Sequence, residues 1–316
     1  MLVTFAWGVE QKCTGKPPRR GWPPGRRPSF YQAALALSRT ARNRTHAKTR
    51  LNRHTANLVM MPAVQTPHAL CATFMAPRFY TPDTEFQLGR TARLTDKARH
   101  HAGRVLRMAA GERAVLFDGK GNEACGPISF DEKGAGILVE DIRRPATESP
   151  LRMTLMQALV SLEKMDWILE KAVEAGAAEI IVFPSERSVV KLAGERLAKR
   201  MAHWQDVIVG ACEQCGRASV PALAFEQHLQ QALGSKRCPA RYILSPGESA
   251  APRLTALQEV AFAVGPEGGF SEEEIALAKS LGWQPALIGP RVLRTETAGL
   301  VALALAGAAS GDMHFV

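Results

Sequence analysis

The sequence predicts an α/β protein with two folded domains, a small β-barrel followed by a larger domain built on a parallel sheet. The length of 316 residues suits about two domains. Short apolar segments separated by turn signals occupy residues 75–145, whereas apolar strand-like runs alternate with helical patterns over residues 150–316. The segment 143–150 between them is polar and interrupted by prolines, which is typical of a linker.

The composition excludes several classes of protein. Apolar residues make up 46% and charged residues 22%, and no run of eighteen apolar residues occurs, so neither a transmembrane helix nor a disordered, collagen-like or coiled-coil chain is expected. Six irregularly spaced cysteines do not predict a disulfide framework, and they indicate a reducing, cytoplasmic location. Cys212 and Cys215 have the spacing of half a zinc site, but no second pair follows. They lie in a helical pattern, so we expect them to pack and expect no metal.

The first 74 residues differ from the rest. They carry twelve Lys and Arg and the single acid Glu10, so they contribute +11 to the formal charge of +10, and the other 242 residues contribute −1. Their prolines and glycines and the lack of an apolar period predict disorder. Three interpretations are open: an organelle transit peptide, a basic arm that contacts RNA, or a mis-assigned start with translation beginning at Met75. We favour the last, because structure-like patterning begins only after Met75.

In the predicted barrel, residues 75–145, four short segments are expected to be strands: 85–88, 114–117, 124–128 and 136–139. Asp118-Gly119 and Gly121-Asn122 are hairpin turn signals, and one helical stretch covers 96–108. Seven Lys and Arg stand against three acids over residues 75–110, which fits a surface that contacts phosphates. A scattered, solvated charge pattern explains this excess equally well.

In the larger domain, strands are expected at 155–160, 180–183, 242–244, 260–264 and 286–288. Ser161 is expected to cap a helix to Ala175, and further helices cover 197–217 and 297–309. Ser271 and Glu274 form the capping-box pattern of a helix that ends at Leu281. Apolar strands alternating with helices predict a parallel sheet that is covered on both faces.

Ligands of parallel sheets bind at the carboxyl ends of strands, and two loops in that position are unusual. The first reads Gly265-Pro266-Glu267-Gly268-Gly269. Glycines allow close approach to the backbone, but the Glu267 carboxylate would repel a phosphate. The loop therefore predicts a ligand with cationic or neutral groups, and a simple tight turn is the alternative.

The second loop, 289–298, joins an apolar strand to an apolar helix and contains Arg294, Thr295, Glu296 and Thr297. Four adjacent polar side chains in such a place need partners, because burying them unpaired is costly. A third cluster, Glu213, Gln214 and Arg217, follows the long helix. On its own it is also explained by a solvated last turn, with Arg217 near the negative end of the helix dipole.

Together these motifs resemble one family, the 16S ribosomal RNA uracil-N3 methyltransferases, also named ribosomal RNA small subunit methyltransferase E. The resemblance covers residues 75–316 and none of 1–74. Its motifs occur in the family's order: Pro77-Arg78-Phe79, Val105-Leu106-Arg107, Lys164 with Glu170-Lys171, Pro184 with Arg187-Ser188, Glu213-Gln214 with Arg217, Gly265 to Phe270, and Leu293-Arg294 with Glu296 to Ala298.

The resemblance implies a PUA-like RNA-binding barrel before a SPOUT methyltransferase domain whose chain forms a trefoil knot. It also implies a homodimer, S-adenosylmethionine as methyl donor, and a uridine in the decoding region of the 16S rRNA of the small ribosomal subunit as target. The residues implied to hold the donor are Leu244, Ser245, Gly265, Pro266, Glu267, Gly268, Gly269, Ile288, Gly289, Leu293, Arg294, Thr295, Thr297 and Ala298. RNA contacts are implied for Arg78, Arg104, Arg107, Arg187 and Gln214.

The catalytic candidates are Arg294 first and Arg217 second, for charge on the uracil oxygens, with Glu296 and its rival Glu213 for proton transfer. Arg217 could come from a second subunit. Three other interpretations are open: a methyltransferase for another rRNA or tRNA nucleotide, a nicotinamide-dependent oxidoreductase, and a non-catalytic RNA-binding module. The sequence offers the oxidoreductase no Gly-x-Gly-x-x-Gly after the first strand, and the binding module leaves both polar loops without a role.

Overall fold

The computed structural model describes residues 76–132, 134–246 and 251–315. All of them belong to Val64–Val316, the second of two units into which the chain divides. The predicted leader, residues 1–74, and the predicted start at Met75 lie outside the described residues.

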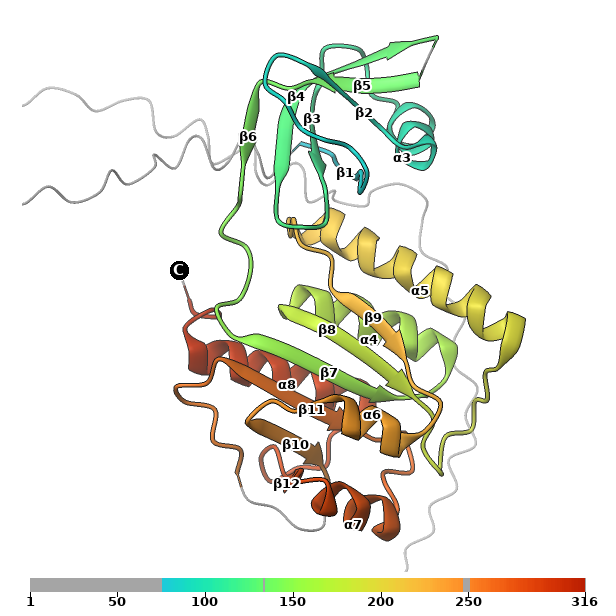
Figure 1. The fold of residues 1–316 in the computed structure, drawn as a ribbon, viewed down its shortest axis with the longest axis vertical. Helices are drawn as coiled ribbons and strands as arrows, with labels where there is room; N and C mark the ends of the chain where they lie inside the picture. The colour runs from blue at the N-terminus through green and yellow to red at the C-terminus, as the bar shows by residue number, and fades with distance from the viewer. Residues whose placement is uncertain (1–75, 133, 247–250, 316) are drawn as a thin grey trace, which may run out of the picture. The chain divides into compact units, whose positions relative to one another are not determined.

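The N-terminal domain is a curved sheet around one apolar core (Figure 1). Its strands are β1 (Arg78–Tyr80), β2 (Thr91–Arg93), β3 (Arg113–Phe117), β4 (Glu123–Asp131), β5 (Gly134–Leu138) and β6 (Asp141–Arg143). They pair in the order β1-β3-β4-β5-β2, with β6 also on β4. Phe79 of β1 and Ala92 of β2 share the core although no ladder joins these end strands in the described chain. The predicted barrel is therefore a partly open one.

Two local expectations for this domain are wrong. Residues 85–88 form no strand, because the chain turns there: the Arg90 N–H donates to the Gln87 carbonyl, and Leu88 stays 66% exposed. The predicted single helix over 96–108 is α3 (Asp96–His100) followed by a π-helical turn, His101–Val105. The hairpin turn is confirmed, since Asp118 accepts from the backbone N–H groups of Lys120 and Asn122 between β3 and β4.

The C-terminal domain contains one sheet of six parallel strands. These are β7 (Arg152–Ala158), β8 (Ala177–Phe183), β9 (Ala222–Phe225), β10 (Ala240–Leu244), β11 (Glu259–Val264) and β12 (Gln284–Ala286). Their order is β12-β10-β11-β7-β8-β9, and every neighbouring pair is parallel. The prediction of a parallel sheet is confirmed, although β9 was not expected and β12 ends two residues before the predicted strand does.

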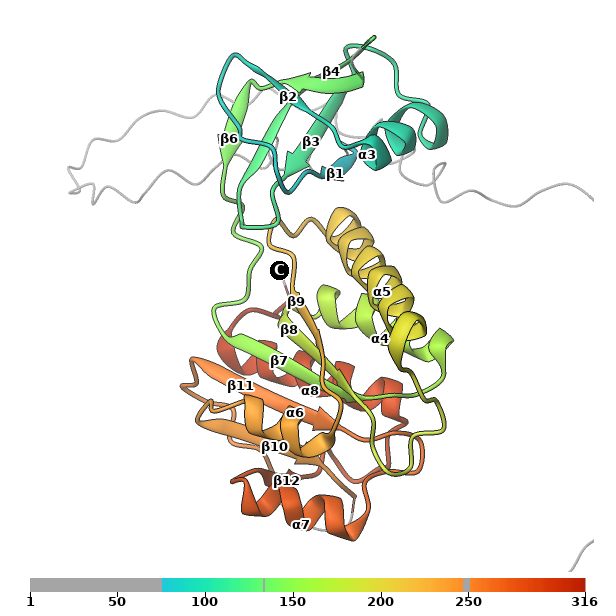
Figure 2. The same cartoon turned by 45° about the vertical axis from the view of Figure 1, so that its right-hand side comes forward.

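Helices cover both faces of this sheet (Figures 1 and 2). The helices are α4 (Leu162–Glu174), α5 (Gly194–Cys215), α6 (Leu229–Ser235), α7 (Glu272–Ser280) and α8 (Thr295–Ser310). Side chains of α4, α5 and α8 share one core with Met153 and Leu155 of β7, whereas α6 and α7 share the other with Met156 and Ala158. The alternation along β7 thus sends its side chains to two cores, as a strand covered on both faces requires.

The two predicted helix caps have different outcomes. Ser271 and Glu274 form the complete capping box at α7, with the Glu274 N–H donating to Ser271 Oγ over 3.2 Å. Ser161 stands at the N-cap of α4, but its side chain makes no capping hydrogen bond. No helix in the described part of the chain is long and apolar enough to cross a membrane.

Candidate active site

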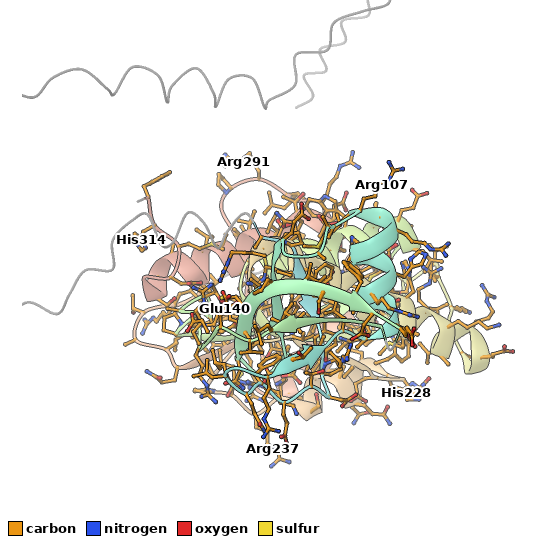
Figure 3. The ribbon with its side chains drawn as sticks, turned by 90° about the horizontal axis from the view of Figure 1, so that it is seen from above. Arg107, Glu140, His228, Arg237, Arg291 and His314 are labelled. Atoms are coloured by element: carbon orange, nitrogen blue, oxygen red, sulfur yellow. The ribbon has the colours of Figure 1, made fainter. Side chains whose placement is uncertain are left out.

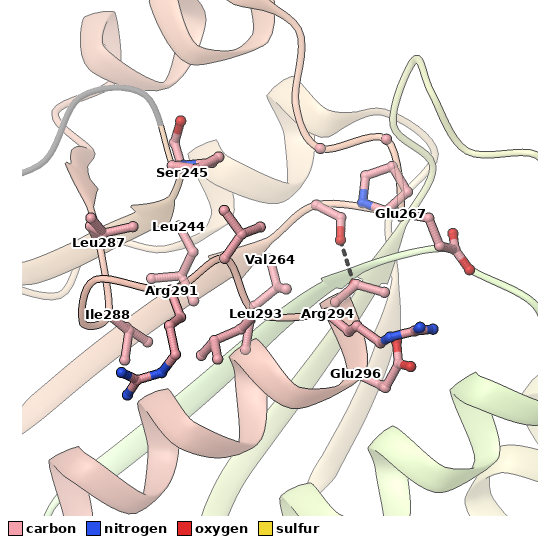
Figure 4. Close-up of a pocket in the computed structure, with 18 of the residues that line it drawn as sticks. Leu244, Ser245, Val264, Glu267, Leu287, Ile288, Arg291, Leu293, Arg294 and Glu296 are labelled. Carbon is pink, nitrogen blue, oxygen red and sulfur yellow. Dashed lines mark hydrogen bonds between the residues drawn. The ribbon is translucent and has the colours of Figure 1, made fainter. Parts of the chain in front are cut away.

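A pocket of about 460 Å³ lies at the carboxyl ends of β10, β11 and β12 (Figure 4). The glycine loop, residues 265–269, forms one wall, and the loop 287–294 with the start of α8 forms another. The two unusual loops of the sequence therefore meet in one pocket. Parallel topology explains this, since strands that run in the same direction bring their carboxyl ends to one edge of the sheet.

The glycine loop depends on the small size of its residues. A Cβ atom on Gly265 would lie 3.1 Å from the backbone of Gly269 and Phe270, and Gly269 has a φ of 68°. The Gly269 N–H donates to the Pro266 carbonyl over 2.9 Å, which closes the turn. Arg187, which lies outside the loop, donates from Nη1 to the Gly268 carbonyl over 2.8 Å. The loop is thus held by its own turn and by Arg187.

Thr295 joins the two walls of the pocket. Its side chain is buried, and its Oγ1 donates to the Gly265 carbonyl over 2.6 Å (Figure 4). The same oxygen accepts from Gln157 Nε2 of β7 over 3.1 Å. Of the four polar residues predicted to need partners, Thr295 is the one that is buried, and both of its hydrogen-bonding capacities are used.

The charges of the pocket centre on Lys164 of α4. Its ammonium donates to Glu267 Oε1 over 2.9 Å and lies 3.6 Å from Glu296 Oε2. The Glu267 hydrogen bond raises the pKa of Lys164. Partial burial alone would raise the pKa of Glu267, but hydrogen bonds from Lys164 and from backbone N–H groups outweigh it and lower this pKa. Both groups therefore stay ionised near neutral pH.

Most of the residues predicted to bind the donor line this pocket. The exceptions are Gly289 and Thr297, which flank it in sequence but are not part of its lining. Two charged lining residues received no role from the sequence, Lys164 and Arg291. Lys164 belongs to a quoted motif, which was the available signal, whereas Arg291 carries no signal beyond its place in the second loop. Arg291 and Arg294 are exposed, and neither forms an ion pair within the described residues.

The cluster at the end of α5 lies elsewhere. Arg217 is only 4% exposed and donates to the Val173 and Ala177 carbonyls over 3.0 and 2.8 Å and to Glu148 of the linker. Glu213 accepts from the Tyr80 N–H of β1 over 3.1 Å, and burial raises its pKa. Neither residue, nor the exposed Gln214, lines the pocket of this chain.

The predicted RNA contacts fall into two kinds. Arg78 is held internally by Glu123, at 2.7 Å, and lies over the Phe117 ring, 5.3 Å from its centroid. Arg104 and Arg107 are exposed, and the structure gives neither of them an ion pair among the described residues. Arg107 lies at the edge of the molecule in Figure 3, with its side chain directed away from the ribbon. Arg187 is exposed beside the glycine loop.

Cys212 is buried in the core on α5, and burial raises the pKa of its thiol to about 12. The described residues contain no cluster of His, Cys, Asp or Glu that could hold a metal ion. The place of Cys212 in that core agrees with the expectation that it packs.

Two family models match the chain. An RNA methyltransferase domain matches residues 147–307, and an RNA methyltransferase PUA domain matches residues 94–133. These matches follow the two domains of the structure in order. Together with the parallel sheet, they confirm the predicted fold class of a PUA-like domain before a parallel-sheet methyltransferase domain.

Two similar proteins carry the same name. The ribosomal RNA small subunit methyltransferase E of Mycobacterium tuberculosis is 31% identical over 243 residues, which cover 74% of this chain and 92% of that protein. The Bacillus subtilis protein of the same name is 30% identical over 225 residues, covering 67% of this chain and 88% of its own.

Two solved structures have a similar fold. The Neisseria gonorrhoeae enzyme of that name, bound to S-adenosylmethionine, gives a TM-score of 0.65 at 37% identity, with 73% of this chain and 96% of that chain covered. A methyltransferase from Legionella pneumophila in complex with the same cofactor gives a TM-score of 0.70 at 38% identity, covering 74% and 98%.

Proposed function

Because the chain belongs to the ribosomal RNA small subunit methyltransferase E family, we propose that it transfers a methyl group from S-adenosylmethionine to N3 of a uridine in the decoding region of 16S rRNA. The observation that carries the proposal is the single pocket formed by the glycine loop and the start of α8, with two acids in its lining. Glu267 and Glu296 can attract a cationic group of the cofactor, and the exposed Arg291 and Arg294 of the same lining can attract its carboxylate.

The pocket fits the proposed donor. Glu296 Oε2 is buried and accepts no hydrogen bond from the described residues, its charged neighbour being the Lys164 ammonium at 3.6 Å, so it can still accept a hydrogen bond from a ligand. The side chains of Leu244, Ile288 and Leu293 supply apolar surface for a nucleoside base. S-adenosylmethionine supplies an electrophilic methyl group on a sulfonium. The residues proposed to hold it are the predicted set that lines the pocket, among which Arg294 contributes little to donor affinity. Gly289 and Thr297 flank that set in sequence.

The reaction makes a moderate demand on the protein. With a pKa of about 9, ionising uridine N3–H at neutral pH costs about 3 kcal/mol. The remaining requirements are alignment and stabilisation of negative charge on the uracil oxygens. Arg294, exposed at the pocket and free of an ion pair in the described chain, is our first candidate for that charge. Glu296 is proposed to accept the proton or to orient Arg294.

A catalytic role for Glu213 or Arg217 would require a second copy, since in one chain their side chains bond elsewhere and neither lines the pocket. A homodimer is part of the proposal. Exposed apolar side chains support it: Trp167 of α4 is 40% exposed, Leu305 of α8 is 47% exposed, and Val292 at the pocket is 80% exposed. Burying them against a second copy would remove apolar surface from water.

The RNA is proposed to contact exposed cations of the barrel and of the region around the pocket, namely Arg104, Arg107 and Arg187. Gln214 is proposed to contact the same RNA. Arg78 is proposed to act indirectly, by holding β1 through Glu123. N3 lies on the pairing edge of the base, so a paired uridine must be freed before transfer. The partner is then 16S rRNA, alone or in the small subunit, and a cytoplasmic location follows from it.

Mapping of methylated uridines in a deletion strain tests the proposal. We expect one 16S rRNA uridine in the decoding region to lose its N3-methyl group and to regain it when the intact gene is returned. Loss of a methyl group from a tRNA or from another rRNA nucleotide would favour the alternative substrate. Binding of labelled S-adenosylmethionine to the purified protein is the matching test in vitro, and its absence would contradict the proposal.

A further inference from the structure

Lys164 occupies a position in the pocket that the proposed reaction does not require. It lies on α4, while its two acidic partners lie on the glycine loop and at the start of α8. The side chains of Lys164, Glu267 and Glu296 are 31%, 44% and 20% exposed, so all three are only partly screened by water. Their charges therefore act on whatever fills the pocket.

One difference between donor and product is relevant to these charges. Transfer forms an N3–CH3 bond and breaks the methyl–sulfur bond, whose electron pair stays on sulfur, while the N3 proton passes to a base. The sulfur is positive in the donor and neutral in the product, whereas the amino and carboxylate groups of the two molecules are the same. A charge in the pocket therefore changes the affinity for the donor relative to the product through its interaction with the sulfur alone.

We propose, on the basis of the proposed function, that Lys164 is a specificity-determining residue that sets how strongly the pocket prefers the sulfonium donor over the thioether product. Glu267 and Glu296 attract the positive sulfur, and Lys164 offsets part of that attraction by pairing with both acids.

This balance has a kinetic consequence. The positive charge on sulfur is lost as the methyl group moves to an anionic base, so acids that stabilise the sulfonium favour the ground state more than the transition state. Two uncompensated carboxylates would bind the donor more tightly and slow its reaction. Lys164 keeps the donor bound without this penalty.

The test is calorimetric titration of the full-length protein and its variants with S-adenosylmethionine and with S-adenosylhomocysteine. Lys164→Met removes the charge and keeps most of the side-chain length, and we expect it to raise the donor-to-product affinity ratio by about three- to tenfold. Lys164→Arg keeps the charge and should leave the ratio within about twofold of the wild type. Glu267→Gln should lower the ratio, because it removes an acid and leaves Lys164 in place.

The outcomes separate this inference from the proposed function. An equal loss of affinity for both ligands in Lys164→Met, with an unchanged ratio, would show that Lys164 only bridges α4 to the loops, and would overturn the inference. If Lys164→Met does not fold, the donor-to-product affinity ratio of Glu267→Gln is the deciding measurement. A ratio equal to that of the wild type would also overturn the inference. A wild-type protein that binds neither ligand would instead contradict the proposed function.

Discussion

Arg294 combines three properties at the scale of a single residue. It lines the pocket, it is exposed, and it stands at the N-cap of α8 without a side-chain capping bond. Its guanidinium is therefore not used to hold the fold. A cation in this state is available to a charge that develops only during reaction.

We expect Arg294→Ala to lower kcat by at least about 100-fold while S-adenosylmethionine affinity changes by less than about threefold. The methylation rate on 16S rRNA checks the expected loss of kcat, and equilibrium binding of the donor checks the expected affinity. Arg291→Ala is the matched control, because Arg291 is also an exposed arginine of the pocket lining. Unchanged turnover in Arg294→Ala would remove Arg294 from the mechanism.

The hydrogen bond from Thr295 to the glycine loop is expected to stabilise the fold. Thr295→Val keeps the shape of the side chain but leaves the Gly265 carbonyl without the donor that now lies 2.6 Å away. We expect a loss of about 1–3 kcal/mol in the free energy of unfolding, measured by urea denaturation. Thr295→Ser retains the hydroxyl and should lose less than about 1 kcal/mol. Equal losses in both variants would mean that packing of the methyl group matters more than the hydrogen bond.

Single residues also differ in whether the sequence could predict their positions. The pocket positions of Glu267 and Thr295 could be predicted because both follow buried parallel strands, whose carboxyl ends meet. The pairing of Lys164 with Glu267 could not, since the two residues are 103 positions apart. It depends on how α4 packs on the sheet, which no local pattern records.

At the scale of elements, the turn that ends the first helical segment is strained. The Met108 N–H donates to the Ala102 carbonyl over 2.9 Å, and Arg107 adopts a φ of 54°. Glycine usually occupies such a position, because a side chain is unfavourable in the left-handed region. Val105 and Leu106, beside it, are 62% and 45% exposed. Strain and exposed apolar groups on one turn favour a binding element over a purely structural one.

Arg107→Gly should therefore change stability and RNA binding in opposite directions. We expect the free energy of unfolding to rise by about 0.5–1 kcal/mol, because the strain is relieved. Affinity for 16S rRNA should fall about three- to tenfold, with a weaker salt dependence, because one phosphate contact is lost. Arg107→Lys keeps the charge and is the control for RNA affinity. Unchanged RNA affinity in Arg107→Gly would show that this turn does not contact the RNA.

The strands show which elements a sequence can reveal. The apolar runs of β7, β8, β10 and β11 were predictable because each strand is buried on both faces and reads as continuous hydrophobicity. The three-residue strands β1, β2 and β6 are too short for a period to appear. The edge strand β9 is only partly buried, so its side chains lack that signature.

On the scale of the whole molecule, the end of α5 joins parts of the chain that are far apart in sequence. Arg217 bonds to α4, to the start of β8 and to the linker, and its own carbonyl accepts from Arg78 of β1 over 3.3 Å. The backbone of Val220 donates to the Gly119 carbonyl nearby. The sequence identified this cluster as a motif, but its partners follow from the strand order, which the motif does not contain.

These contacts predict that Arg217 matters for stability. Arg217→Ala would leave two buried carbonyls and Glu148 without their partner, and we expect a loss of about 3–5 kcal/mol in the free energy of unfolding. Arg144→Ala is the matched control, because exposed Arg144 lies in the same linker and, within the described chain, bonds Asn122 alone, at 2.8 Å. Its loss of stability should stay below about 1 kcal/mol. Urea denaturation of the two variants measures the difference.

A mixing experiment then decides whether Arg217 also acts in a partner's pocket. In a hybrid of Arg217→Ala and Arg294→Ala subunits, one pocket would combine an intact Arg294 with an intact Arg217 from the other subunit. If Arg217 acted in trans, mixing two inactive variants would restore methylation. From its internal bonds we expect instead that folded Arg217→Ala retains at least about a third of wild-type turnover by itself. Mixing the two variants should then give no more activity than folded Arg217→Ala has by itself, because the substitution of Arg217 lowers stability and not catalysis.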